Sequence, residues 1–163
     1  FARGRFTVKL TLREVTGKDI DLLFRWANDP VTRQNAFHTE QIPYETHRAW
    51  FVKMLADRDV LKYILCSTNN AGEVQNIGQI RLSIEDGEAL IDYSIDPEKR
   101  GQGYGTRMIL MAEEKLRELR MDVIYCKGQV KHANIASAKA FEKCGYDMDE
   151  KEQYLEFIKR IRS

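Results

Sequence analysis

Cysteine and histidine are scarce in this 163-residue sequence, which argues against a disulfide-rich protein and against a metal-binding one. The three cysteines, Cys66, Cys126 and Cys144, are widely spaced and form no Cys-x-x-Cys pair. They therefore indicate neither a disulfide framework nor a zinc site, and we predict three buried, reduced thiols. The three histidines lie far apart and show no metal-ligand spacing, so we expect no metal site.

The sequence also lacks a surplus of either charge and any long apolar run. It has 26 basic and 25 acidic residues, so no global field favours nucleic acid or an anionic membrane. No apolar run approaches the ~20 residues of a membrane span, and no signal peptide is visible. We expect a single cytoplasmic domain over residues 1–163, a monomer or homodimer, that acts on a small molecule.

Hydrophobic periodicity predicts an alternation of strands and helices. The predicted strands are Thr7–Leu12, Tyr63–Cys66, Ile77–Ile84, Ala89–Ile95 and Val123–Cys126, followed by a terminal hairpin within Asp147–Ile161. The predicted helices are Asp19–Ala27, a second beginning at Pro43, Thr106–Arg120 and Asn134–Cys144. Asp86-Gly87 predicts a hairpin turn between two of the strands. This order indicates an α+β fold, with a mixed sheet and helices on both faces.

Two helices carry more detailed predictions. Trp50 belongs to the expected buried stripe of the second helix, whereas His47 is predicted to lie at its surface. In the helix Thr106–Arg120 we expect Leu119 to be buried and Glu113 to pair with Arg117 on the solvent face.

The segment Asp96–Gly105 joins a strand to a helix and contains three alternate glycines. Residues without a Cβ let backbone N–H groups converge on an anion, and the helix dipole adds partial positive charge. Arg100 contributes a fixed charge nearby. The pattern is neither a P-loop nor a dinucleotide fingerprint, because no Gly-Lys-Ser/Thr follows and Thr106 replaces the third glycine. The loop therefore predicts a diphosphate cradle, and a glycine-rich turn without a ligand is the alternative.

Two motifs resemble those of the GCN5-related N-acetyltransferase (GNAT) superfamily. Gln102-Gly103-Tyr104-Gly105, preceded by Arg100-Gly101, is similar to the coenzyme A signature R/Q-x-x-G-x-G/A. Residues 134–146 resemble the block N-x-x-A/S-x-x-x-Y/F-x-x-x-G-F/Y. The resemblance covers about Leu12 to Tyr146, with both motifs in the expected order.

The resemblance implies a GNAT fold with six to seven strands, about four helices and splayed central strands. It also implies acetyl-CoA as co-substrate, whose pantetheine arm pairs with the strand ending at Ile95 like an added β-strand. A backbone N–H near Ile95 would stabilise the oxyanion. The implied cofactor residues are Ile95, Arg100, Gly101, Gln102, Gly103, Tyr104, Gly105, Thr106, Asn134, Ser137, Phe141 and Lys143.

The catalytic groups depart from the family pattern. Many members use a tyrosine to protonate the leaving thiolate, and Phe141 occupies that position here. Tyr93, Tyr146, Ser137 or water are the alternatives, as is an unassisted thiolate. Gln129 stands where some relatives carry a carboxylate base. Asp92 is our preferred base, with Glu88, Glu40 and His47 as further candidates, so we predict Asp92, Tyr93 and Ile95 as catalytic.

The acceptor region, Trp26–Phe37 with Ile42–Phe51, resembles GNAT enzymes that acetylate nucleotide-linked amino sugars in pseudaminic-acid and spore-coat polysaccharide pathways. Enzymes that acetylate protein N-termini share a similar frame. The predicted substrate-binding residues are Trp26, Asn28, Arg33, Asn35, Phe37 and Glu40. Trp26 and Phe37 offer apolar faces, and Arg33 a partner for phosphate, unless Trp26 is core and Arg33 pairs with Asp29.

The expected function is therefore N-acetylation of a primary amine in a ternary complex, with an amino sugar as the leading acceptor. A protein N-terminus or a small amine is the second possibility. Because Phe141 and Gln129 replace catalytic residue types, a non-catalytic acyl-CoA-binding module also remains open.

Overall fold

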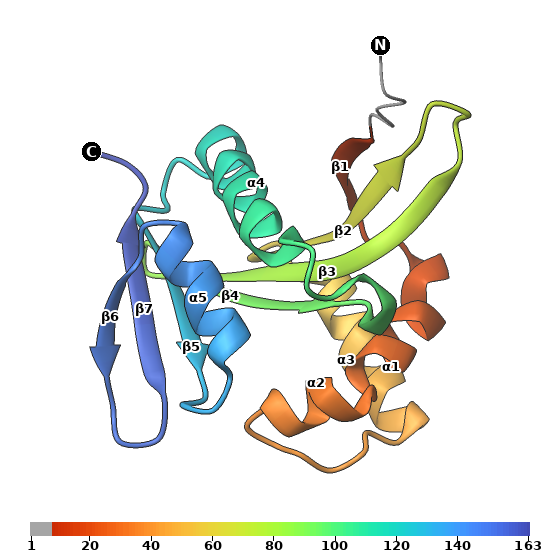
Figure 1. The fold of residues 1–163 in the computed structure, drawn as a ribbon, viewed down its shortest axis with the longest axis horizontal. Helices are drawn as coiled ribbons and strands as arrows, with labels where there is room; N and C mark the ends of the chain where they lie inside the picture. The colour runs from red at the N-terminus through yellow and green to blue at the C-terminus, as the bar shows by residue number, and fades with distance from the viewer. Residues whose placement is uncertain (1–7) are drawn as a thin grey trace.

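Residues 8–163, which the computed structural model describes, form a seven-stranded sheet with helices on both faces (Figure 1). The strand order is β1-β2-β3-β4-β5-β7-β6, and all neighbours are antiparallel except β4 and β5. The strands are β1 Lys9–Glu14, β2 Val60–Thr68, β3 Val74–Glu85, β4 Glu88–Ile95, β5 Tyr125–Val130, β6 Asp147–Glu150 and β7 Leu155–Arg160. The helices are α1 Ile20–Ala27, α2 Pro30–Asn35, α3 Tyr44–Ala56, α4 Tyr104–Leu119 and α5 Ile135–Lys143.

The two faces of the sheet carry separate cores, because successive side chains of a strand point in opposite directions. On β2, Tyr63 and Leu65 belong to the larger core, which α4 and α5 cover. Ile64 and Cys66 face the other way and pack with α1 and α3. The strand residues of the smaller core all lie on β2, so α1 and α3 cover only part of their side of the sheet.

The predicted fold class and element order are confirmed, with two differences. The segment Asn28-Asp29-Pro30 ends α1 as predicted, but it also starts the short helix α2, which the sequence did not indicate. Asp29 caps α2 by accepting a hydrogen bond from the backbone N–H of Thr32, and Pro30 occupies its first turn. The fifth strand begins at Tyr125, later than the predicted Val123. Thr7, the start of the predicted first strand, lies outside the described residues.

Local signals at turns and helix ends are confirmed. Asp86 and Gly87 have φ values of 51° and 78°, as a two-residue β3–β4 turn requires. Asn134 caps α5, and Gly145 follows its end with φ 88°. All three cysteines are buried and free. Within residues 8–163, no helix has the length and apolar character needed to cross a membrane.

Four predictions of burial are wrong. Trp50 is 37% exposed, whereas His47 is buried and its Nε2 lies 2.9 Å from the carbonyl oxygen of Ile20. Leu119, the last residue of α4, is exposed. Glu113 lies 3.6 Å from Arg117, as predicted, but is 99% buried. Helical periodicity alone does not reveal which neighbour covers a given side chain.

Strands β4 and β5 separate partway along their length. Their parallel pairing runs from Glu88 and Tyr125 to Ile91 and Gly128, while β4 continues to Ile95. Residues 92–95 of β4 therefore keep their pairing with β3 but have none with β5. This confirms the splayed central strands and leaves a free β4 edge beside α5.

The buried carboxylate of Glu113 ties α4 to the C-terminal hairpin. It accepts hydrogen bonds from the Tyr146 hydroxyl and from Lys159 Nζ, both at 2.8 Å. Lys159 also donates to the carbonyl oxygen of Cys144 at 2.7 Å. A buried charge is tolerated only when it is paired and hydrogen-bonded, and this network meets both conditions.

We expect Glu113→Ala to lower the free energy of unfolding by about 3–5 kcal/mol, because it leaves Lys159 charged, partly buried and unpaired. Glu114→Ala, one residue along on the exposed side of α4, should cost less than about 0.5 kcal/mol. Urea denaturation followed by circular dichroism measures both. Equal losses for the two variants would contradict this role of Glu113.

Candidate functional site

One cavity of about 950 Å³ extends from α1–α3, across the middle of β3 and the end of β4, to the Asp96–Gly105 loop and α5. It brings together most of the residues predicted from the sequence. Those lining it are Asp92, Tyr93, Ile95, Arg100, Gly101, Gly103, Tyr104, Gly105, Thr106, Asn134, Ser137, Phe141, Lys143, Trp26, Arg33, Asn35 and Phe37. Gln102, Asn28 and Glu40 do not line it.

The glycine loop has the backbone that an anion site needs. Gly101 and Gly103 have φ values of 76° and 82°, which favour glycine, and a Cβ on either would meet no atom within 4 Å. Gly103 precedes α4, whose first turn receives no side-chain cap. Free N–H groups and the helix dipole therefore face an open space, which fits the diphosphate of a CoA-type ligand.

Gly105 has a different structural role from Gly101 and Gly103. A Cβ at this position would lie 3.2–3.3 Å from the Tyr93 ring and hydroxyl. The missing side chain therefore lets the first turn of α4 pack against Tyr93.

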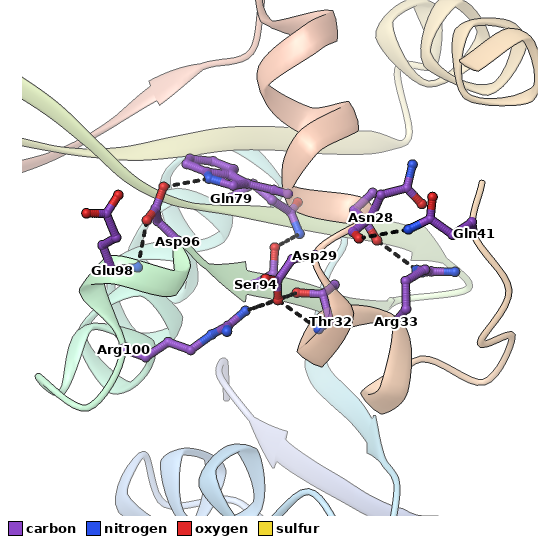
Figure 2. Close-up of polar contacts among 12 residues, drawn as sticks. Asn28, Asp29, Thr32, Arg33, Gln41, Gln79, Ser94, Asp96, Glu98 and Arg100 are labelled. Atoms are coloured by element: carbon purple, nitrogen blue, oxygen red, sulfur yellow. Dashed lines mark hydrogen bonds and ion pairs between the residues drawn. The ribbon is translucent and has the colours of Figure 1, made fainter. Parts of the chain in front are cut away.

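Arg100 is not a free cation, contrary to what the sequence suggested. Its Nη2 lies 2.6 Å from Asp29 Oδ2 and 3.3 Å from Thr32 Oγ1 (Figure 2). Burial acts to raise the pKa of Asp29, but the bonds from Arg100 and from the Thr32 backbone outweigh it, and the pKa is lowered. Lys139 and Lys143 on α5 also line the cavity, and neither forms an ion pair within residues 8–163.

Two contacts join α1 and α2 to the glycine loop. The first is the Arg100–Asp29 pair. In the second, Trp26 Nε1 donates to Asp96 Oδ2 at 2.8 Å, while Asp96 Oδ1 accepts from the Glu98 N–H at 2.9 Å (Figure 2). The motif Trp26-Ala27-Asn28-Asp29-Pro30 thus holds α1 and α2 against the glycine loop.

Asn28 and Arg33 both support the loop 36–43, and of the two only Arg33 also lines the cavity. Asn28 bonds to both the N–H and the carbonyl oxygen of Ile42, at 2.8 and 2.9 Å. Arg33 donates to the carbonyl oxygens of Ala27, His38 and Glu40, and it does not pair with Asp29. Only the backbone of Glu40 takes part. Polar residues that close a loop cannot be told from ligand-binding ones by type alone.

On the α5 side of β4, Tyr93 lies beside Phe141. The Tyr93 hydroxyl is 3.1 Å from Ser137 Oγ, and the two rings meet edge to face at 6.1 Å. Burial raises the pKa of Tyr93, and the bond to Ser137 offsets only part of this increase. Tyr93 therefore keeps its proton at neutral pH.

Phe141 is packed into the core at the point where β4 and β5 separate. Its ring stacks on Phe157 at 5.3 Å and fills the space where Gly128 would carry a Cβ, which would lie 2.3 Å from the ring. Any larger residue at 128 would displace it.

The opposite face of the β3–β4 hairpin carries a polar cluster that the sequence reasoning mostly missed. Gln79 is opposite Ser94 and Arg81 is opposite Asp92 in the strand register. Gln79 Nε2 lies 3.2 Å from Ser94 Oγ, and Arg81 Nη2 lies 2.8 Å from Asp92 Oδ2. The guanidinium of Arg81 stacks 4.7 Å above the Trp50 ring. The alternation of apolar and polar residues along Ile77–Ile84 predicts that Gln79 and Arg81 face away from the core. This alternation is the sequence signal from which the polar cluster could have been found.

The candidates for a general base differ in whether they line the cavity. Asp92 lies in the cavity wall, as does the buried His47, whereas Glu88 pairs with Lys127 at the start of β4 and Glu40 lies outside the cavity. Residues 8–163 contain no group of three or more His, Cys, Asp or Glu side chains that could hold a metal ion.

The splayed sheet and the glycine loop at the start of α4 define an acetyltransferase-type α+β domain. A family model described as "Acetyltransferase (GNAT) domain" matches residues 9–147. The chain belongs to this family, as its motifs indicated.

Solved structures with this fold include a domain from Methanocaldococcus jannaschii, with TM-score 0.83, 19% identity and coverage of 94% of this chain and 99% of that chain. A spermidine N-acetyltransferase from Vibrio cholerae, in complex with CoA and spermine, has TM-score 0.76, 17% identity and coverage of 91% and 93%. The aminoglycoside acetyltransferase AAC(6')-Ib, in complex with coenzyme A and kanamycin, has TM-score 0.75, 19% identity and coverage of 93% and 95%. The comparison with curated proteins gives no match.

The Asp29–Arg100 contact can be tested by separating its two functions. Asp29→Asn should keep the cap of α2 but weaken the bond to Arg100, lowering the free energy of unfolding by about 1.5–3 kcal/mol. Asp29→Ala also removes the cap and should cost about 1 kcal/mol more. Urea denaturation measures both values, and an unchanged stability of Asp29→Asn would show that the contact does not hold the two parts together.

Proposed function

We propose that this domain transfers an acetyl group from acetyl-CoA to a primary amine within a ternary complex. The observation that carries the proposal is the continuity of one cavity from the uncapped start of α4, past the free edge of β4, to the helices α1–α3. The presence of CoA in complexes of the spermidine and aminoglycoside acetyltransferases described above supports it.

The cofactor-side wall has groups for each part of acetyl-CoA. Backbone N–H groups of the glycine loop and of the first turn of α4 would bind the diphosphate, and the ammonium groups of Lys139 and Lys143 offer further positive charge. The free edge of β4 at residues 92–95, including the N–H of Ile95, offers hydrogen bonds to the pantetheine arm. When bound, acetyl-CoA supplies a thioester from which acetyl passes to the amine nitrogen while CoA leaves as the thiol.

We assign Tyr93 as the proton donor to the leaving thiolate, in place of the tyrosine that many family members carry where this chain has Phe141. Its hydroxyl lies in the cavity wall, carries its proton at neutral pH and is oriented by Ser137. Phe141 packs beside Tyr93, so the Tyr93 hydroxyl belongs to the same part of the site as position 141. A proton held at Tyr93 Oη would favour departure of the thiol over the thiolate.

The acceptor-side wall suits the amine. Asp92 can take a proton from the incoming ammonium, directly or through water, since its side chain is exposed at the cavity even though it pairs with Arg81. For this acetyltransferase activity, we propose a nucleotide-linked amino sugar as the acceptor. Phe37, 50% exposed, and the exposed Trp50 and Val31 offer apolar surface to a deoxysugar or a base. Trp26 contributes less than its type suggested, because it is buried.

Binding of CoA can be tested at Gly103. Gly103→Ala forces a side chain into a left-handed backbone conformation at a cost of roughly 1–2 kcal/mol, so the loop should relax and the Kd for CoA should rise about tenfold. Gly72→Ala is the matched control: it has φ 84°, equally open surroundings and a position in the β2–β3 turn. Calorimetric titration with CoA should find the control unchanged. Undiminished CoA binding by a folded Gly103→Ala protein would refute the assigned cradle.

Catalysis can be tested at Tyr93. Thiol release from acetyl-CoA with a panel of amines should occur in the wild type, and Tyr93→Phe should lower kcat by 10²-fold or more, within the range of about 10²–10⁴ for acid catalysis. The Kd for CoA should stay the same, because the ring that packs on Gly105 is kept. A protein that binds CoA but releases no thiol with any amine would instead be an acyl-CoA-binding module.

A further inference from the structure

The exposed ring of Trp50 lies in an arrangement that core packing does not explain. Trp50 lines the cavity, and the guanidinium carbon of Arg81 lies 4.7 Å from the centroid of its ring. The ring of His47, one turn earlier on α3, lies 5.6 Å from the same ring. His47 is itself fixed, because its Nε2 donates to the carbonyl oxygen of Ile20 at 2.9 Å. The tryptophan therefore connects an anchored residue of its own helix to a cation of the sheet.

Arg81 carries this contact on to Asp92. The two residues are opposite each other in the register of β3 and β4, and Arg81 Nη2 lies 2.8 Å from Asp92 Oδ2. An ion pair that water can reach is normally weak, since the long basic side chain loses rotamer freedom when it forms. Stacking on an aromatic ring restricts the guanidinium before it meets the carboxylate. Trp50 thus offsets part of the entropy that opposes the pair.

A neighbouring cation is turned away from this pair. Lys62 on β2 is opposite Arg81 in the register, where two like charges repel each other. Its Nζ donates instead to the carbonyl oxygens of Met54 and Asp57, at 2.9 and 3.0 Å, where α3 ends. The helix α3 thus binds both cations of this face, one through carbonyl groups and the other through an aromatic ring. Arg81 is left in place to meet Asp92.

The carboxylate of Asp92 is held through one of its two oxygens. Oδ2 lies 2.8 Å from Arg81 Nη2 and 3.5 Å from Gln79 Nε2. Oδ1 receives no hydrogen bond from residues 8–163, and the side chain is 59% exposed at the cavity. A general base has to present a free atom within hydrogen-bond reach of the proton that it takes. The contacts at Oδ2 therefore fix the carboxylate and leave Oδ1 for the substrate.

We propose that Trp50 is a positioning residue for the general base and that it acts through Arg81. The proposal rests on the proposed acetyltransferase function, in which Asp92 takes a proton from the incoming ammonium. An N–H bond of the ammonium breaks and an O–H bond forms at Oδ1, while the nitrogen keeps the electron pair that attacks the thioester. Trp50 and Arg81 take no part in this transfer. They fix the position of Oδ1, and this role accounts for an exposed tryptophan on a helix whose histidine is buried.

Substitutions at Trp50 test the proposal in steady-state assays of thiol release from acetyl-CoA. The acceptor is the amine that the wild type acetylates fastest among a UDP-linked 4-amino sugar, spermidine, kanamycin and a peptide with a free N-terminus. Trp50→Leu should lower kcat by about tenfold or more, because a catalytic group displaced by about 1 Å can cost 10²-fold. The KM for the acceptor should change less than kcat. Trp50→Phe keeps an aromatic face for the guanidinium and should restore most of kcat.

A double-mutant cycle shows whether Trp50 acts through Arg81. Arg81→Gln alone should lower kcat by about the same factor as Trp50→Leu, roughly tenfold or more. In the Arg81→Gln background, Trp50→Leu should cause no further decrease, because residues that act through one contact are not additive. If the two decreases multiply, Trp50 does not act through Arg81 and the proposal is wrong.

Tyr44→Leu is the matched control. Tyr44 is an exposed aromatic residue on α3 whose ring also lies near His47, at 6.3 Å, but it does not line the cavity. Its replacement should leave kcat unchanged. Calorimetric titration with CoA and urea denaturation verify that each variant is folded and binds CoA as the wild type does.

The outcomes separate this proposal from the function on which it rests. A Trp50→Leu protein in which only the KM for the acceptor rises would show that Trp50 merely contacts the acceptor, which overturns the proposal. An equal loss of kcat in Tyr44→Leu would overturn it as well. Both results leave the acetyltransferase function intact. A wild type that binds CoA but acetylates none of the four amines would refute the proposed function, and the positioning role of Trp50 with it.

Discussion

The end of the pairing between β4 and β5 is the constraint on which the rest of the site depends. The parallel ladder stops at Ile91 and Gly128, and Phe141 of α5 packs where Gly128 has no side chain. Beyond this point β4 keeps its hydrogen bonds to β3 and has a free edge toward α5. A sheet interior normally satisfies both edges of a strand, so this edge is available to a ligand.

The two halves of the cavity are joined through polar contacts rather than through a common apolar core. The larger core lies under α4 and α5, and the smaller core lies under α1 and α3. Trp26–Asp96 and Asp29–Arg100 connect the second group of helices to the glycine loop (Figure 2). Both bonds lie where β4 leads into the glycine loop, so the position of α1 and α2 depends on that loop.

Local signals predicted much of the fold because their physical causes are local. Alternation along β3 and β4, the Asp86-Gly87 turn, the Asn134 cap and the glycines at 101 and 103 each depend on a few neighbouring residues. The roles of Asn28, Arg33 and Arg100 depend on partners 14, 6 and 71 positions away. Glu113 illustrates the same limit: its i,i+4 partner was foreseen, but its burial under Tyr146 and Lys159 was not.

The family, the order of the elements and the glycine loop can all be predicted from residue types, because these types set the hydrophobic spacing and the freedom of the backbone. Which charged side chains are unpaired becomes clear only in the folded chain. In the sequence, Arg100 and Arg81 are basic residues like Lys139 and Lys143. In the structure, Arg100 pairs with Asp29 and Arg81 pairs with Asp92. The charge that a ligand meets depends on distances between side chains from different elements, and those distances exist only after the chain has folded.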